Sequence, residues 1–202
     1  MNPAAAFVSG LLFSFSLIVA IGAQNAYVLR QGALREHVVT VVAICAASDI
    51  VLIAAGVAGM GTVVADSPAV MSVVRAAGAA LLLAYGAFAA RRALAAPRGS
   101  LDGAAAGASR RRVIALTMSF TWLNPAVYLD TLILLGSVAS AHPGSHWWFG
   151  AGAGTASIAW FIALGFGARL LTPLLYRPLT TRLIDAFVAV VMTITALRTI
   201  PT

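Results

Sequence analysis

The chain has 202 residues, of which 61% are hydrophobic and 9% charged, with a formal net charge of +7. Soluble domains carry about 25% charged residues, and they cannot bury apolar side chains in this proportion. All thirteen basic residues are arginine, and they occur in clusters that do not follow a nucleic-acid-binding face. The composition therefore excludes a soluble enzyme, gives no reason to expect a nucleic-acid partner, and predicts a polytopic membrane protein.

Six apolar runs are each long enough to cross a lipid bilayer as an α-helix, which takes about 20 residues. Residues 1–29 carry no charged side chain and lack the basic start of a cleaved signal peptide, so we predict a retained first helix. The other runs are 38–64, 69–90, 113–140, 147–171 and 183–200. The pattern predicts an all-α protein with six transmembrane helices in a single transmembrane domain, residues 1–202.

The loops between these runs alternate in charge. Cytoplasmic loops of membrane proteins retain arginine and lysine, so we expect loops 30–37, 91–112 and 169–182 to be cytoplasmic. Both termini would then face outward. Arg75, just inside the third run, and Arg198, near the C-terminus, depart from this pattern.

A segment rich in glycine and arginine at about 96–112 is predicted to be a cytoplasmic linker between two halves, about 1–95 and about 113–202. The halves resemble each other at Asn25-Ala26-Tyr27-Val28-Leu29 and Asn124-Pro125-Ala126-Val127-Tyr128-Leu129, and at Ala47-Ser48 and Ala156-Ser157. Three helices in each half place the halves in opposite orientations, as in many secondary transporters. We therefore predict two inverted three-helix repeats, although alanine-rich helices also give chance matches.

Two aspartates lie within the apolar runs, Asp49 near the middle of the second and Asp130 at a comparable position in the fourth. An aspartate at the centre of a transmembrane helix costs about 2.5–3.5 kcal/mol on insertion scales. A protonated or hydrogen-bonded carboxyl that joins two helices would be a structural explanation. Because we expect no matching arginine in the interior of the membrane, the two acids favour a cation site or a proton relay.

Polar clusters interrupt the first and fourth runs at matching places, Gly22-Ala23-Gln24-Asn25 and Thr121-Trp122-Leu123-Asn124-Pro125. Pro125 has no amide hydrogen, so the carbonyl of Thr121 loses its helical partner and must find another partner or line a wet cavity. Gln24 and Asn124 can satisfy such groups or bind the amino and carboxylate ends of a substrate. Broken helices in both halves indicate a transport site at the membrane midplane, although a simple proline kink would also explain the fourth run.

Other residues have structural interpretations. Cys45 is expected to be a small buried hydrophobe, and the histidines lack metal-ligand spacing, so we expect no metal and no cofactor. Asp185 is placed at the start of the sixth run, where a helix N-terminus stabilises an acid. Gly150, Gly152 and Gly154 predict a close helix contact, within the chain or in a homo-oligomer.

Three motifs resemble those of the lysine/arginine exporters, the LysE/ArgO group of the LysE superfamily. They are Ile21-Gly22-Ala23-Gln24-Asn25, Ser48-Asp49 and Thr121-Trp122-Leu123-Asn124-Pro125-Ala126-Val127-Tyr128-Leu129-Asp130. The resemblance implies an inner-membrane secondary transporter that exports arginine, lysine or analogues such as canavanine, driven by the proton gradient or the membrane potential. Ala23 departs from the proline that this family usually has there.

Together, the residues and the resemblance predict two sets of site residues. Those expected to bind substrate or protons are Asp49, Asp130, Gln24, Asn25, Asn124, Tyr128 and Ser48, and those expected to break the helices are Gly22, Pro125 and Thr121. An exporter of neutral amino acids of the threonine or homoserine type is the alternative function. We expect no enzymatic activity, because the runs contain neither a serine–histidine pair nor histidine ligands. The sequence does not separate a carrier from a gated channel.

Overall fold

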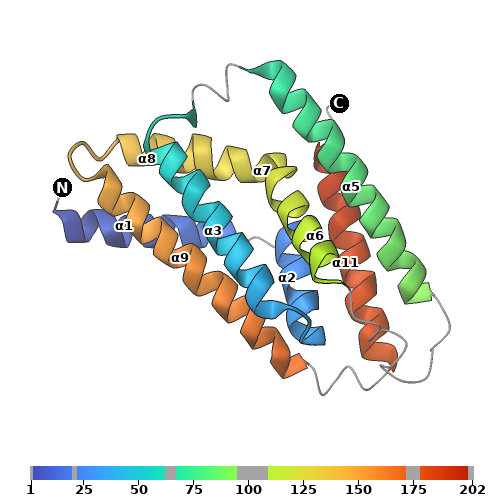
Figure 1. Cartoon of the computed structure of the whole chain (residues 1–202). Helices are drawn as coiled ribbons and strands as arrows, with labels where there is room; N and C mark the ends of the chain where they lie inside the picture. The colour runs from blue at the N-terminus through green and yellow to red at the C-terminus, as the bar shows by residue number, and fades with distance from the viewer. Residues whose placement is uncertain (1, 20–21, 62–66, 95–108, 172–177, 200–202) are drawn as a thin grey trace.

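The structure is a computed structural model that describes residues 2–19, 22–61, 67–94, 109–171 and 178–199, all in helices and their connecting turns. The helices are α1 (Pro3–Ile18), α2 (Ala23–Leu34), α3 (Val38–Val57), α5 (Pro68–Leu94), α6 (Arg110–Trp122), α7 (Pro125–Tyr128), the π-helix η2 (Leu129–Leu135), α8 (Gly136–Ser140), α9 (His146–Gly167), the 3-10 helix η3 (Ala168–Leu171) and α11 (Pro178–Thr199) (Figure 1). The all-α prediction is confirmed for this part of the chain. Most of the predicted linker at 96–112 lies outside the described residues.

Two segments, α3 and His146–Leu170, are individually long and apolar enough to cross a membrane. Two further spans result if α1 with α2, and α6 with Pro125–Ser140, each form one broken span; the members of these pairs are inclined by 83° and 54°. The described residues thus provide two to four candidate spans. Six spans and an inverted repeat remain predictions.

Both bends occur at the predicted polar clusters. The first apolar run is therefore two helices rather than the single helix predicted for 1–29, and the second of them continues to Leu34. The last run begins earlier than predicted, at Pro178 rather than at residue 183. Where the structure describes the arginine-rich segments that were expected to be loops, parts of them are helix ends, since α2, α5 and α6 extend into them.

Glycines let α1 and α9 pack closely. A Cβ on Gly10 would overlap the backbone of Phe149, and a Cβ on Gly152 would overlap the backbone of Phe7. Only residues without a side chain allow helix backbones to approach so closely. The predicted close contact at Gly152 is therefore confirmed, and it lies within the chain.

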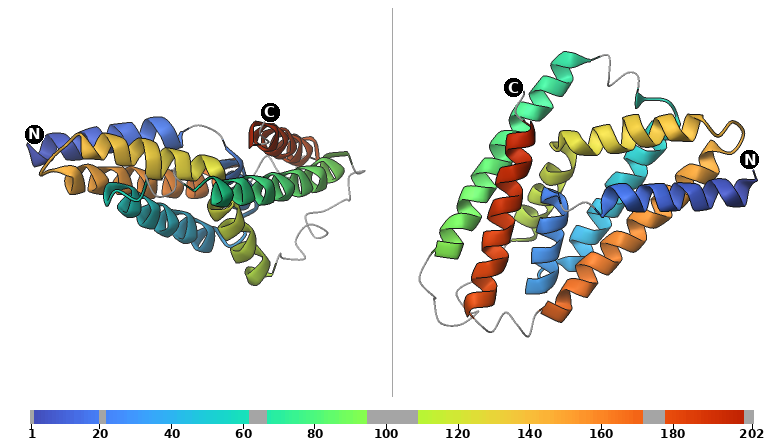
Figure 2. Two further views of the ribbon diagram at one scale, coloured as in Figure 1. Left: turned by 90° about the horizontal axis from the view of Figure 1, so that it is seen from above. Right: turned by 180° about the vertical axis from the view of Figure 1, so that it is seen from behind.

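The other helices pack in pairs and around one aromatic cluster. The helix α3 packs against α9 and η2, while α5 and α11 lie side by side and antiparallel. Figure 2 shows this pair on one side of the molecule, with α1, α3 and α9 grouped on the other and α2 and α6 between them. An aromatic cluster of Tyr27, Tyr85 and Phe120, with ring centroids 5.0–5.7 Å apart, joins α2, α5 and α6.

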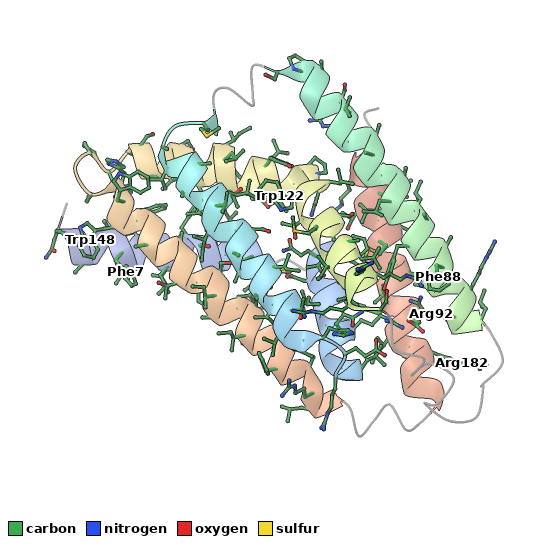
Figure 3. The ribbon with its side chains drawn as sticks, viewed as in Figure 1. Phe7, Phe88, Arg92, Trp122, Trp148 and Arg182 are labelled. Carbon is green, nitrogen blue, oxygen red and sulfur yellow. The ribbon has the colours of Figure 1, made fainter. Side chains whose placement is uncertain are left out.

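Asp185 holds three helices together at one end of this arrangement. Its Oδ1 accepts hydrogen bonds from Arg30 Nε at 3.1 Å and Arg92 Nη2 at 3.0 Å, which connects α11 with α2 and α5. Arg92 also lies over the ring of Phe88, 4.4 Å from its centroid (Figure 3). The interpretation of Asp185 as a helix N-terminal acid was wrong, because α11 begins seven residues earlier, beyond the reach of the N-terminal dipole.

Candidate functional site

The first break separates α1 from α2. Asn25, 8% exposed, donates from Nδ2 to the carbonyl of Ile18 at 2.7 Å, and its Oδ1 accepts from Trp160 Nε1 at 3.3 Å. The end of α1 leaves carbonyls without helical partners, which would be costly in an apolar environment. Asn25 therefore fixes the break by satisfying one of them and by connecting it to α9.

The second break separates α6 from α7 and is held by several side chains. Asn124 caps α7, since its Oδ1 accepts from the amide of Ala126 at 3.2 Å. The hydroxyl of Tyr128 donates to the carbonyl of Trp122 at 2.6 Å. Trp122 Nε1 donates to Ser48 Oγ at 3.1 Å and so ties the break to α3. Figure 3 shows Trp122 where α6 meets α7.

Asp130 lies one turn beyond this break, in the π-helix η2. Single-turn π segments within α-helices are rare and occur often at functional sites. The carboxylate is half-buried, and it makes no hydrogen bond or ion pair with any group in the described part of the chain. It is therefore able to receive a cation or a proton.

Asp49 and Gln24 are more deeply buried. Asp49, on α3, is 6% exposed, and its Oδ2 accepts a hydrogen bond from Ser157 Oγ of α9 at 2.8 Å. Gln24, in the first turn of α2, is 8% exposed, and its Nε2 has no hydrogen-bond partner among the described residues. An unpaired buried donor is costly, so a ligand that accepts a hydrogen bond from it would lower the energy.

A cavity of about 430 Å³ joins these side chains. Its volume falls within the range of about 300–1,000 Å³ that is usual for small-molecule sites. The predicted site residues that line it are Gly22, Gln24, Asn25, Asp49, Asn124, Pro125 and Asp130. Both carboxylates and both breaks therefore meet at one cavity.

Three predicted site residues, Ser48, Thr121 and Tyr128, are absent from the cavity wall. The Thr121 hydroxyl donates to the carbonyl of Thr117 at 3.0 Å within α6. Ser48 and Tyr128 hold the second break through the bonds described above. Their hydrogen-bonding groups are thus used within the protein rather than at the cavity surface.

Two arginines that the sequence prediction left out of the site, Arg75 of α5 and Arg198 of α11, also line the cavity. The premise that the two acids have no matching arginine was therefore wrong. The sequence carried a signal for them, because both arginines departed from the alternation of charge along the loops. That signal did not point to the cavity, since only the pairing of α5 with α11 brings the two residues together.

Comparison with known proteins gives the family. The model of the LysE type translocator family matches residues 15–201. The chain belongs to the LysE type translocator family. Proteins of this family are membrane transporters, which take small-molecule substrates and are not generally enzymes, so the resemblance seen in the motifs is confirmed.

Relatives of this LysE family member occur in mycobacteria. Proteins of Mycobacterium bovis and of two strains of Mycobacterium tuberculosis are each 45% identical to the chain over 177 residues, which are 88% of this chain and 88% of the relative. Each carries the description "Putative amino-acid transporter". No solved structure shows a significant match.

Proposed function

We propose that this LysE family member exports amino acids and binds them in the cavity between the two helix breaks. The meeting of both breaks and both carboxylates at one cavity carries this proposal. Broken helices expose backbone donors and acceptors that can bind the polar ends of a substrate. The descriptions of the mycobacterial relatives support amino acids as the substrate class.

The two acids support a basic amino acid such as arginine or lysine, or an analogue such as canavanine. A basic amino acid carries two cationic groups, and Asp49 and Asp130 offer one carboxylate for each. Gln24 Nε2 is a donor for the substrate carboxylate. A neutral amino acid has a single cationic group and would use only one of the two acids.

A neutral amino acid of the threonine or homoserine type is the second candidate. The observation that favours it is the formal charge of the cavity wall, where Arg75 and Arg198 balance Asp49 and Asp130. A cavity without net charge suits a zwitterion. With a basic substrate, both aspartates would bind cationic groups of the substrate. With a neutral substrate, one aspartate would bind its amino group and the other would stabilise an arginine of the cavity wall.

Transport is proposed to occur by alternating access in the inner membrane, driven by the proton gradient or the membrane potential. The packing of α3 on α9 and of α5 on α11 supports two related halves, because each pair joins helices at corresponding places in the two halves. The helices α1 and α6 both end at a break, as such halves require. The arginine-rich helix ends would face the cytoplasm.

Efflux from cells loaded with labelled arginine, lysine or threonine tests the proposal. We expect Asp130→Asn to reduce arginine and lysine efflux at least tenfold, because it removes the carboxylate for one cationic group. Glu36→Gln is the matched control, since it removes one negative charge just after α2 and outside the cavity. Membrane levels of all variants are measured by immunoblot.

The outcomes separate the candidates. Loss of arginine and lysine efflux in Asp130→Asn, with normal efflux in Glu36→Gln, supports a basic substrate. Threonine efflux without arginine efflux from the intact protein would move it to the neutral type. Near-normal arginine efflux in Asp130→Asn would remove Asp130 from the site, and no efflux of any of the three would reject the proposed function.

A further inference from the structure

We propose that Arg75 and Arg198 form the carboxylate-binding end of the cavity and make the transporter select amino acids over amines that lack a carboxylate. This inference rests on the proposed function and gives the substrate carboxylate two charged partners in addition to the donor Gln24 Nε2. Its basis is the position of the two arginines, the absence of an acidic partner for them among the described residues, and the opposite charge of the facing wall.

The antiparallel pairing of α5 and α11 brings the two arginines to the same end of the helix pair. Arg75 lies in the second turn of α5, which begins at Pro68, and Arg198 lies in the last turn of α11, which ends at Thr199. Both side chains line the cavity. Two like charges at one end of a cavity repel each other, and a bound anion relieves that repulsion.

A glycine fixes where Arg75 lies relative to the second break. Gly78 follows Arg75 by three residues and so lies on the same face of α5. A Cβ on Gly78 would overlap the carbonyl oxygen of Leu123 and would lie 3.6 Å from Cδ of Pro125. The face that carries Arg75 therefore packs directly on the break, whose residues Asn124 and Pro125 line the same cavity.

At the opposite end of the same helix pair, arginines with a structural role form ion pairs. There Arg30 and Arg92 both donate to Asp185, at 3.1 and 3.0 Å. Arg75 and Arg198 make no ion pair or hydrogen bond with any group in the described part of the chain. No acid of the described residues occupies their guanidinium groups, which can therefore pair with the carboxylate of a substrate.

The acidic and the basic side chains of the cavity belong to different helices. Asp49 and Asp130 belong to α3 and η2, which pack on each other, whereas Arg75 and Arg198 belong to the α5–α11 pair. Figure 2 shows that pair on the other side of the molecule from α3. An amino acid can therefore lie between them, with its carboxylate toward α5 and α11 and its cationic groups toward α3 and η2.

Guanidinium is well suited to this task. Its fixed fork of N–H donors matches the two oxygens of a carboxylate, and such charge-assisted pairs are roughly twice as strong as neutral hydrogen bonds. An amine without a carboxylate would leave both arginines unpaired and would add positive charge beside them. The cavity should therefore reject the decarboxylated form of its own substrate.

Counterflow into liposomes that contain the purified protein tests this selectivity. The probes are labelled arginine and agmatine, which is arginine without its carboxylate. We expect the intact protein to prefer arginine at least tenfold. Arg75→Gln and Arg198→Gln should each lower the arginine rate at least tenfold while leaving the agmatine rate unchanged or higher, so that the preference collapses. Threonine and 1-amino-2-propanol replace this pair if the efflux assay identifies a neutral substrate.

Two further variants control for structural effects. Arg91→Gln removes an exposed arginine from the other end of α5 and should keep the intact preference. Arg75→Lys keeps the positive charge but loses the paired N–H donors of guanidinium, and should keep part of the preference for arginine over agmatine. A parallel fall in both rates, with the ratio unchanged in Arg75→Gln and Arg198→Gln, would overturn the inference while the proposed function stands. Failure of the intact protein to transport any amino acid would reject both.

Discussion

At the scale of single residues, the polar side chains of the two breaks fall into two groups. Asn25, Ser48 and Tyr128 use their hydrogen-bonding groups to hold the breaks. Gln24 Nε2 and the Asp130 carboxylate make no hydrogen bond within the described residues. An apolar environment makes every unsatisfied backbone group costly, so a broken helix needs the first group for stability and can use only the second for a substrate.

Tyr128→Phe tests this division. Removing the hydroxyl leaves the carbonyl of Trp122 without its donor, which should cost about 1–3 kcal/mol of stability. We expect a lower midpoint of thermal unfolding in detergent with an unchanged KM for export. The control is Thr155→Ala, which removes an exposed hydroxyl that bonds only within α9 and should barely change the midpoint. A raised KM without loss of stability would instead place the Tyr128 hydroxyl at the substrate.

The sequence could not separate these two groups. Asn25 and Gln24 are neighbours in one motif and have the same chemistry, and only the position of Ile18 and Trp160 decides that Asn25 is the bonded one. The breaks themselves were predictable, because a proline without an amide hydrogen and a glycine-containing polar cluster interrupt apolar runs locally. Arg75 and Arg198 were not, because they meet through contacts between helices far apart in the chain.

At the scale of helices, close packing of α1 on α9 supports the first break. The two helices touch through Gly10 and Gly152, and Trp160 of α9 then bonds Asn25 just beyond the end of α1. The position of α9 therefore fixes both the end of α1 and the start of α2. The small-residue pattern in α9 was predictable from spacing, whereas its partner helix was not. The π-helical register at Asp130 was also missed, since no local residue pattern signals it.

Gly152→Ala should loosen this contact. The new methyl group would overlap the backbone of Phe7, which cannot rotate away as a side chain can. Overpacking of this kind typically costs about 1–3 kcal/mol, so we expect a lower unfolding midpoint and reduced export. Gly167→Ala is the matched control on the same helix, because a Cβ there would meet no atom within 4 Å. Equal midpoints for the two variants would contradict the packing argument.

At the scale of the whole molecule, the described arginines gather at two opposite ends of the helices. The ends of α2, α5 and α9 and the starts of α6 and α11, which carry most of the described arginines, lie together at the lower side of Figure 1. Figure 3 shows Arg92 and Arg182 in this region. Arg75 and Arg198 lie at the other end of α5 and α11, at the cavity. The excess of arginine on the cytoplasmic side of membrane proteins explains the first group. The proposed binding of the substrate carboxylate explains the second.

This division predicts the orientation in the membrane. Arg111 lies in the first turn of α6 and Ser140 ends α8, so the two exposed residues lie at opposite ends of one candidate broken span. If the arginine-rich end is cytoplasmic, a membrane-impermeant maleimide should label Ser140→Cys in intact cells but Arg111→Cys only after permeabilisation. Cys45→Ala serves as the background, because the native thiol is buried and its removal leaves one reactive site. Labelling of Arg111→Cys in intact cells would contradict this orientation.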